Sequence, residues 1–300
     1  METNVTPALV SVIIPTHNRR KRLSAAIESV FAQTYSHLEV IVVNDASTDD
    51  TATWLESLAQ KKLTIINNPQ SKGGAVSRNI GVQAANGTYI AFLDDDDTWE
   101  KTKIEKQIQL LEQENAVAAN CYFTNHHLPR KKAYVQKTGQ TKFKAMLLDN
   151  MLGGASVCIC RKKVFEQVNG FNSALPSAQD WDLWLKLVQC GKIVTVKEPL
   201  VNYYAHQDAR ISTNWHNKYI GQKLCYEQYK PLMDKAIKHH HLAMIGIYGI
   251  LSEPSSLTQK LKTLFYFFKH GKLKFYPRCR FIAATIYRLM HLYFVNHNKH

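Results

Sequence analysis

The amino-acid sequence predicts an α/β fold built on a doubly wound, mostly parallel sheet, with a helical appendage at the C-terminal end. Up to residue 116, short apolar runs typical of buried strands alternate with stretches whose apolar residues recur at helical spacing. This alternation is typical of parallel sheets with right-handed crossovers. Polar and acidic residues directly follow the strand candidates, at the sheet edge where open α/β proteins bind ligands.

The composition is that of a globular protein. The chain has 300 residues, 45% of them hydrophobic, which is enough for one large domain plus a smaller appendage. Its amino terminus lacks the basic start of a signal peptide, and the early apolar run from Leu9 to Ile14 is broken by Pro15, so we expect a cytoplasmic protein. The six cysteines show no CxxC spacing and are expected to be buried free thiols.

Basic residues are concentrated at the C-terminal end. The net charge is +14, and nine Lys/Arg but no Asp/Glu follow Glu253. We find no nucleic-acid recognition motif, and this tail is rich in Phe and Tyr, so an anionic membrane surface fits it better than nucleic acid. One apolar stripe comprises Leu257, Leu261, Leu264, Phe265 and Phe268, and a broader one runs from Phe281 to Phe294. Alternatively, these stripes pack on the preceding α/β domain or a partner subunit.

The first strand candidate is Val10 to Ile14. Apolar residues at the spacing of one helix face follow it, namely Leu23, Ala26, Ile27, Val30 and Phe31. The turn between them, Pro15 to Arg19, contains no glycine. The Gly-rich fingerprint that binds a dinucleotide pyrophosphate is therefore missing, which disfavours a nicotinamide or flavin enzyme.

The second strand candidate, Glu39 to Val43, ends in polar residues. We expect Ser47 or Thr48 to cap the next helix. Capping does not account for Asp45, which directly follows the strand and could accept a hydrogen bond from a nucleotide base or sugar. A third strand, Leu63 to Asn67, precedes a glycine pair and a helix carrying Arg78, which could reach a phosphate or a base edge.

The acidic run Asp94 to Asp97 directly follows the apolar run Tyr89 to Leu93. Four carboxylates this close repel one another, and a divalent cation with a polyphosphate would neutralise them, since Mg²⁺ and Mn²⁺ prefer oxygen ligands. The alternative is a solvated acidic loop that caps the helix after Trp99.

Beyond residue 116 the pattern loosens. Val117 to Thr124 is a strand candidate, and Pro129 to Lys144 is expected to be a basic, mobile loop. A later helix has one apolar face, expected to be core, formed by Trp181, Trp184, Leu185 and Val188. Asp180 falls at the start of this helix, where we expect the helix dipole to favour its ionised form, as a general base requires.

Four motifs, in this order, resemble those of the family 2 glycosyltransferases, which have the GT-A fold: Ser11–Arg19, Val42–Asp49, Gly74–Asn79 and Phe92–Asp97. The resemblance continues more weakly through Gly170-Phe171, Gln179–Trp184 and Pro199–His206. It implies a catalytic domain over residues 1–212, with a nucleotide-sugar-binding half at 8–116 and an acceptor half at 117–212. Residues 213–300 would form the basic, aromatic-rich helical region.

The resemblance implies a metal-dependent hexosyltransferase that uses Mn²⁺ or Mg²⁺. It would move a sugar, with inversion, from a nucleoside-diphosphate donor, usually a UDP-sugar, to a hydroxyl of a glycan or lipid-linked acceptor in bacterial surface polysaccharide or lipopolysaccharide synthesis. Such an enzyme would be peripheral on the inner face of the cytoplasmic membrane.

The resemblance also implies roles for individual residues. Asp45 would bind uracil, Asp96 in the DxD element would be the direct metal ligand, and Asp180 would be the catalytic base. His206 is a candidate for contacting the diphosphate or metal, with a surface or core histidine as the alternative. The residues along the nucleotide sugar would be Pro15, Thr16, Asn18, Arg19, Asp45, Arg78, Asp94 and Asp95.

Three positions depart from the family pattern. Gln179 stands where many relatives have Glu, Asn44 where many have Asp, and the stretch Tyr203–His206 lacks the common arginine. Gln179 is the one hint of a non-catalytic nucleotide-sugar-binding module. A polyprenyl-phosphate sugar transferase is a second alternative, but such enzymes commonly carry membrane spans of about 20 apolar residues, and charges interrupt every candidate here.

Overall fold

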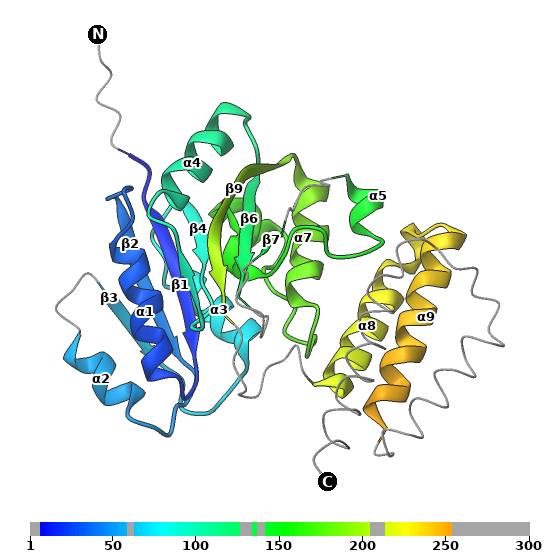
Figure 1. The fold of residues 1–300 in the computed structure, drawn as a ribbon, viewed down its shortest axis with the longest axis horizontal. Coiled ribbons are helices and arrows are strands. Elements are labelled where there is room, and N and C mark those ends of the chain that lie inside the picture. The colour runs from blue at the N-terminus through cyan, green and yellow to red at the C-terminus, as the bar shows by residue number, and fades with distance from the viewer. Residues whose placement is uncertain (1–6, 59–62, 127–133, 137–141, 205–213, 254–300) are drawn as a thin grey trace. The chain divides into compact units, whose positions relative to one another are not determined.

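The computed structural model describes residues 7–58, 63–126, 134–136, 142–204 and 214–253. The chain divides into two compact units, Met1–Asp208 and Ala209–His300. The second unit contains α8 (Trp215–Tyr229) and α9 (Lys235–Ser252), which pack against each other (Figure 1). The stripes expected after residue 256, and Cys279, lie outside the described residues.

The first unit is an α/β structure. Its strands are β1 (Val10–Thr16), β2 (Leu38–Asn44), β3 (Leu63–Asn67), β4 (Tyr89–Phe92), β5 (Asp97–Trp99), β6 (Ala118–Asn125), β7 (Tyr134–Gln136), β8 (Ile159–Arg161) and β9 (Ile193–Tyr203). Its helices are α1 (Arg20–Phe31), α2 (Thr51–Ser57), α3 (Gly74–Gln83), α4 (Lys103–Gln113), α5 (Phe143–Met146), η1 (Ala155–Val157), α6 (Lys162–Gln167) and α7 (Gln179–Cys190).

Within the described residues the strands form one sheet in the order β3-β2-β1-β4-β8-β6-β9-β5, with β7 beside β6. Strands β1 to β4 pair in parallel, as do β6 and β9. The short strand β8 lies antiparallel between β4 and β6, and β5 is antiparallel to β9. The predicted fold class, a mostly parallel open sheet with flanking helices and C-terminal helices, is therefore confirmed.

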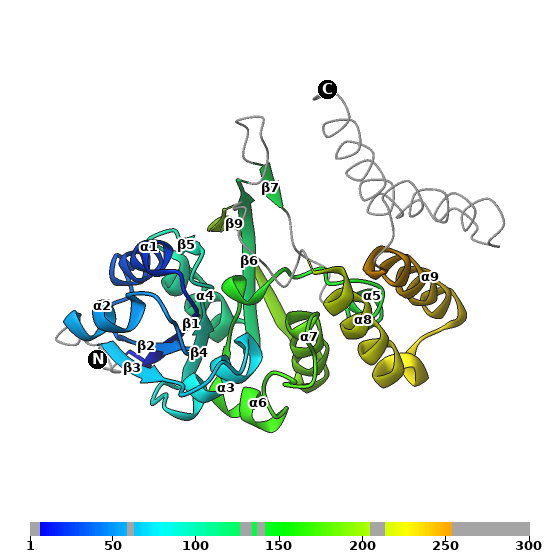
Figure 2. The same cartoon turned by 90° about the horizontal axis from the view of Figure 1, so that it is seen from below.

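The core lies on both faces of the central strands. All seven residues of β1 are buried, and α1 and α3 cover opposite faces of the sheet (Figure 2). Gly81 of α3 allows this packing to be close, because a Cβ there would lie 2.4 Å from the Ile13 side chain. Strands buried on both faces are apolar throughout rather than alternating, which is the pattern that the sequence shows.

Most predicted helix faces are confirmed. Leu23, Ala26, Ile27 and Val30 are buried on α1, but Phe31 is 40% exposed because it ends the helix at the margin of that stripe. On α7, Trp181 and Trp184 are buried, as expected for core residues.

Two local expectations were wrong. Ser47 and Thr48 do not cap α2, which begins at Thr51, because their polar groups bond to Asn18 instead, and the Thr51 amide donates to Asp49 Oδ1 at 3.0 Å. Residues 134–136, expected in a loop, pair with β6 as β7.

The five cysteines within the described ranges are free thiols, as predicted, and all but Cys190 are buried. No helix in the described part of the chain is both long and apolar enough to cross a membrane.

Candidate functional site

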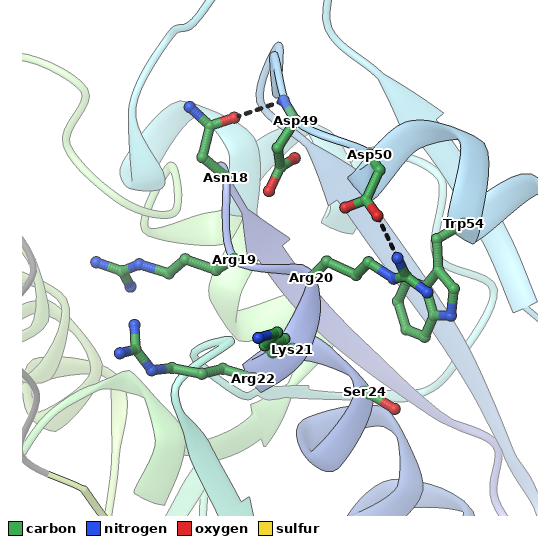
Figure 3. Close-up of a pocket in the computed structure, with 9 residues that line it drawn as sticks. All are labelled: Asn18, Arg19, Arg20, Lys21, Arg22, Ser24, Asp49, Asp50 and Trp54. Carbon is green, nitrogen blue, oxygen red and sulfur yellow. Dashed lines mark hydrogen bonds and ion pairs between the residues drawn. The ribbon is translucent and has the colours of Figure 1, made fainter.

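The turns after β1 and β2 are joined at the carboxyl edge of the sheet. Asn18, in the left-handed conformation with φ 55°, accepts hydrogen bonds on Oδ1 from the amides of Thr48 at 2.7 Å and Asp49 at 3.3 Å (Figure 3). Its own amide donates to Ser47 Oγ at 2.9 Å. Asn18 therefore holds the two turns together at one edge of the site.

Asp45, directly after β2, is buried and accepts hydrogen bonds from four donors of the loop that leads into α3. These are Asn68 Nδ2, Ser71 Oγ, and the amides of Lys72 and Gly73, all at 2.8–2.9 Å. Burial alone would raise the pKa of Asp45, but these hydrogen bonds lower it to about 2. The four donors occupy the roughly four lone-pair positions of this carboxylate, so Asp45 holds the loop in place. Its contact with uracil stays a prediction, and that contact would require one of the four donors to move away.

A basic cavity of about 740 Å³ lies beside the turn after β1. Arg19 and Arg22 extend to one side of it, whereas Arg20 turns toward Trp54 and pairs with Asp50 (Figure 3). Clustered guanidinium groups suit an anionic ligand such as a phosphate. The cavity is lined by Asn18, Arg19, Arg20, Lys21, Arg22, Ser24, Asp49, Asp50 and Trp54.

The four acids after β4 do not act as one group. Asp95 is buried and accepts hydrogen bonds from Thr16 Oγ1 at 2.8 Å and Arg19 Nη1 at 2.9 Å. Burial raises its pKa to about 6, although Arg19 opposes the shift. Asp94, Asp96 and Asp97 instead form a cluster, with one carboxylate oxygen from each lying within 4.8 Å of the others. Asp95 thus holds the turn after β1, with a longer contact from Arg19 Nη1 to Asp96 Oδ2 at 3.3 Å, and the other three carboxylates converge.

The cluster is supported by Ser156, which the sequence reasoning missed. Its Oγ donates to Asp97 Oδ2 at 2.6 Å and accepts from the Asp94 amide at 3.1 Å. Trp99 Nε1 in turn donates to the Ser156 carbonyl at 3.0 Å. Asp97 was also missed as a separate site residue, although its place in the acidic run was a signal for it. Ser156 gave none, because it lies 59 residues away in sequence.

Arg78 connects the cluster to α7. It is buried, pairs with Asp94, and lies with its guanidinium carbon 5.3 Å from the centre of the Phe171 ring. Burial would lower the pKa of Arg78, but Asp94 and Asp180 raise it above its ordinary value, so the side chain stays charged. Gln179 donates to the Leu175 carbonyl at 2.8 Å, which gives this side chain a structural contact of its own.

Asp180 lies in the first turn of α7, as predicted. We expected the helix start to favour the ionised form of Asp180, but the largest influence on its pKa is burial, which favours the protonated form. Burial raises the pKa of Asp180 to about 6, the attraction of Arg78 opposes this, and Asp94 adds to it. The carboxyl group is therefore still ionised at neutral pH, but it binds a proton much more readily than a solvated aspartate.

The structure thus brings most of the predicted site residues to one edge of the sheet. Thr16 and Arg19 contact Asp95, and Arg78 contacts Asp94 beside Asp180. Pro15 lies within buried β1, where it supports the turn rather than facing open space. His206 lies outside the described residues.

Comparisons with known proteins agree with this arrangement. The family model "Glycosyl transferase family 2" matches residues 11–168. The Escherichia coli enzyme "UDP-Glc:alpha-D-GlcNAc-diphosphoundecaprenol beta-1,3-glucosyltransferase WfaP" is 29% identical over 235 residues, which is 78% of this chain and 89% of that protein.

Two solved structures share the fold at low sequence identity. TarS 1-349 from S. aureus in complex with UDP-GlcNAc has a TM-score of 0.63 at 18% identity, covering 86% of this chain and 80% of that one. The mannosyltransferase PcManGT from Pyrobaculum calidifontis, in complex with GDP-Man and Mn²⁺, has a TM-score of 0.62 at 19% identity, covering 94% and 80%. The family match spans more than half of the sequence, and the chain therefore belongs to glycosyl transferase family 2.

Proposed function

We propose that this glycosyltransferase moves a sugar from a UDP-sugar to a hydroxyl of a glycan or lipid-linked acceptor, with inversion at the anomeric carbon, during surface polysaccharide synthesis. The observation that carries the proposal is the convergence of three carboxylates near buried Arg78 and half-buried Asp180. The relative WfaP is described as using UDP-Glc and a diphosphoundecaprenol-linked sugar, which supports the donor and acceptor classes.

The residues present fit a divalent cation. Asp94, Asp96 and Asp97 offer three carboxylate oxygens within 4.8 Å, the ligand type that Mg²⁺ and Mn²⁺ prefer. When bound, the cation would neutralise charge on the diphosphate as the glycosyl–phosphate bond breaks. The Mn²⁺ named with GDP-Man in the PcManGT structure supports this assignment. Asp96, predicted as the direct ligand, would thus share the role with its two neighbours.

The nucleotide would lie along the basic cavity and the turn after β1. Arg19 faces this cavity, and Thr16 fixes Asp95 beside it. Arg78 would add positive charge near the phosphates, and Asn18 and Asp45 would hold the two loops that enclose the base. These side chains position the donor so that its diphosphate meets the three-carboxylate cluster.

Asp180 would act as the general base. It would take the proton of the acceptor hydroxyl as that oxygen attacks the anomeric carbon, and no second carboxylate nucleophile is needed for inversion. Its pKa of about 6 suits this role, since a base is most effective when its pKa lies near the working pH. Burial thus adjusts this carboxylate toward proton transfer at neutral pH.

The same proposal places the enzyme on the inner face of the cytoplasmic membrane, where a lipid-linked acceptor would lie. It rests on the basic, acid-free sequence after Glu253 and on the lipid-linked substrate named for WfaP. Several Lys and Arg side chains near an anionic surface together provide useful, salt-sensitive binding energy.

Thermal stabilisation with a set of UDP-sugars, each with and without Mn²⁺, tests the donor. We expect stabilisation by UDP-sugars that requires the cation. With the donor identified, acceptor-dependent release of UDP tests transfer. Metal-dependent binding without any acceptor-dependent UDP release, across lipid-linked and free glycan acceptors, would contradict catalysis and favour the binding module.

A further inference from the structure

Tyr203 carries a buried hydroxyl that the assigned roles do not use. Tyr203 pairs with Asp97 across the antiparallel strands β9 and β5, so both side chains lie on one face of the sheet. Its ring packs on Phe123 with ring centres 4.4 Å apart. The hydroxyl oxygen is buried and has no hydrogen-bond partner within the described residues. Buried hydroxyl groups are nearly always hydrogen-bonded, so this one calls for a partner that is not part of the chain.

The hydroxyl lies near the acidic residues, because Asp97, Asp94 and Asp180 all act on it electrostatically. A phenol keeps its proton at physiological pH and can donate a hydrogen bond.

Gly154 lies close to this hydroxyl and to Asp180. A Cβ at this position would lie 3.0 Å from the Tyr203 oxygen and 3.7 Å from Asp180 Oδ2. The backbone of Gly154 is extended, with φ −77°, so the conformation itself admits other residues. Glycine at this position therefore avoids crowding the two groups rather than permitting an unusual turn.

We propose that the Tyr203 hydroxyl donates a hydrogen bond to a hydroxyl oxygen of a sugar lying between Asp180 and the three-carboxylate cluster. This inference rests on the proposed function and deepens it. A base at one side and a diphosphate site at the other define the place of the transferred sugar. The acceptor sugar, whose hydroxyl must approach Asp180, is the other sugar that could accept this hydrogen bond.

The test is Tyr203→Phe, which removes only the hydroxyl. Calorimetry with Mn²⁺ would compare UDP with UDP-glucose or UDP-GlcNAc, whichever stabilises the unaltered protein. We expect about tenfold weaker binding of the UDP-sugar and unchanged binding of UDP, the effect of losing one neutral hydrogen bond. A tenfold higher KM for the acceptor with unchanged donor binding would instead assign the acceptor sugar. The melting temperature should stay the same or rise, since no partner within the protein is lost.

Tyr89→Phe is the matched control. The Tyr89 hydroxyl accepts a hydrogen bond from Arg161 Nη1 at 3.1 Å and pairs with Glu112 at the opposite end of β4 from the acidic run. Its removal should lower the melting temperature and leave donor and acceptor constants unchanged. A second variant, Gly154→Ala, should weaken UDP-sugar binding in the same selective way, because its methyl group would displace the Tyr203 hydroxyl.

Unchanged donor and acceptor constants in Tyr203→Phe would overturn the inference, as would an equal loss of UDP and UDP-sugar binding, which reports a general disturbance. Failure of the proposed function is distinguishable from this, because the unaltered protein would then show no metal-dependent UDP-sugar binding at all.

Discussion

Asp45 and Asp180 are two enclosed aspartates with opposite environments. Four donors surround the carboxylate of Asp45 and lower its pKa to about 2. Asp180 lies beside Arg78, but burial outweighs that attraction and raises its pKa to about 6. The lone pairs of Asp45 are occupied by donors of its own chain, so this carboxylate stabilises a loop. Asp180 is raised in pKa by burial and therefore binds a proton more readily. The contrast separates an acid that orders a loop from the acid that we propose as the base.

Replacing Asp180, the proposed base, should have the largest effect on transfer. Asp180→Asn keeps the shape of the side chain but cannot accept a proton at neutral pH, so transfer should fall by about 10²–10⁴-fold. Donor affinity, measured by calorimetry, should stay within a few-fold of the original. A loss of turnover smaller than about tenfold would mean that another group is the base.

Asp96→Ala and Asp97→Ala should each abolish Mn²⁺-dependent binding of UDP, because each removes one carboxylate of the cluster. Calorimetry with and without the cation measures this. Glu114→Ala is the control, since that carboxylate pairs with Lys192 on the surface, and its removal should change nothing in binding. Retention of metal-dependent affinity in both cluster variants would remove the metal role from this site.

Replacing each of the two aspartates by asparagine should change the free energy of unfolding in opposite directions. The Lys72 and Gly73 amides donate to different oxygens of Asp45, and Asp45→Asn leaves one neutral acceptor oxygen in place of two charged ones, which should lower the free energy of unfolding by roughly 1–3 kcal/mol. Asp180→Asn removes a charge that burial disfavours and should raise the free energy of unfolding, by on the order of 3 kcal/mol at pH 7.5 for a pKa raised from 3.8 to about 6. Urea unfolding measures both, and equal signs would refute the distinction.

The two acids should also differ in the pH at which they matter. The stability from Asp45 is present above about pH 4 and is lost as the pH falls toward its folded pKa of about 2. Protonation of Asp180 stabilises the fold below about pH 4, and this gain is lost as the pH rises through about 6.

We expect an acidic limb in which activity falls as the pH drops through about 6, since the proposed base, Asp180, must be ionised to accept a proton. Asp95 also has a pKa of about 6, so a pH profile of Asp95→Asn identifies the source. A limb that persists in this variant belongs to Asp180. A limb that disappears would assign the titration to Asp95 and leave the predicted base without support.

Membrane binding by the acid-free end of the chain should be the smallest of the expected effects. Residues 254–300 carry only basic charges, and each Lys or Arg near an anionic surface contributes about 1 kcal/mol. Sedimentation with anionic liposomes should therefore recover the intact protein at low salt and release it at high salt. Neutral liposomes are the control, and equal binding to both kinds, or to neither, would contradict membrane docking.

The sequence predicted the elements of the site well because strand ends can be read locally. Buried runs ending at Thr16, Asn44 and Phe92 place their following residues at one edge of the sheet, and helical spacing placed Asp180 at a helix start. The division of the acidic run could not be predicted, because it depends on Thr16 and Arg19 contacting Asp95 across 79 and 76 residues. The same holds for Ser156, whose role arises only when η1 packs under β4 and β5.

The pairing of β5 with β9 has a consequence for how this domain can be divided. Asp97 ends the acidic run of the first half, yet its strand is completed by residues 201–203 of the second half. A fragment ending near residue 116 would leave β5 without its neighbour and Asp97 without Ser156. Residues 8–116 and 117–212, the predicted donor and acceptor halves, therefore depend on each other. A recombination event that exchanged only the second of them would have to bring a matching β9 to keep the edge that carries the three-carboxylate cluster intact.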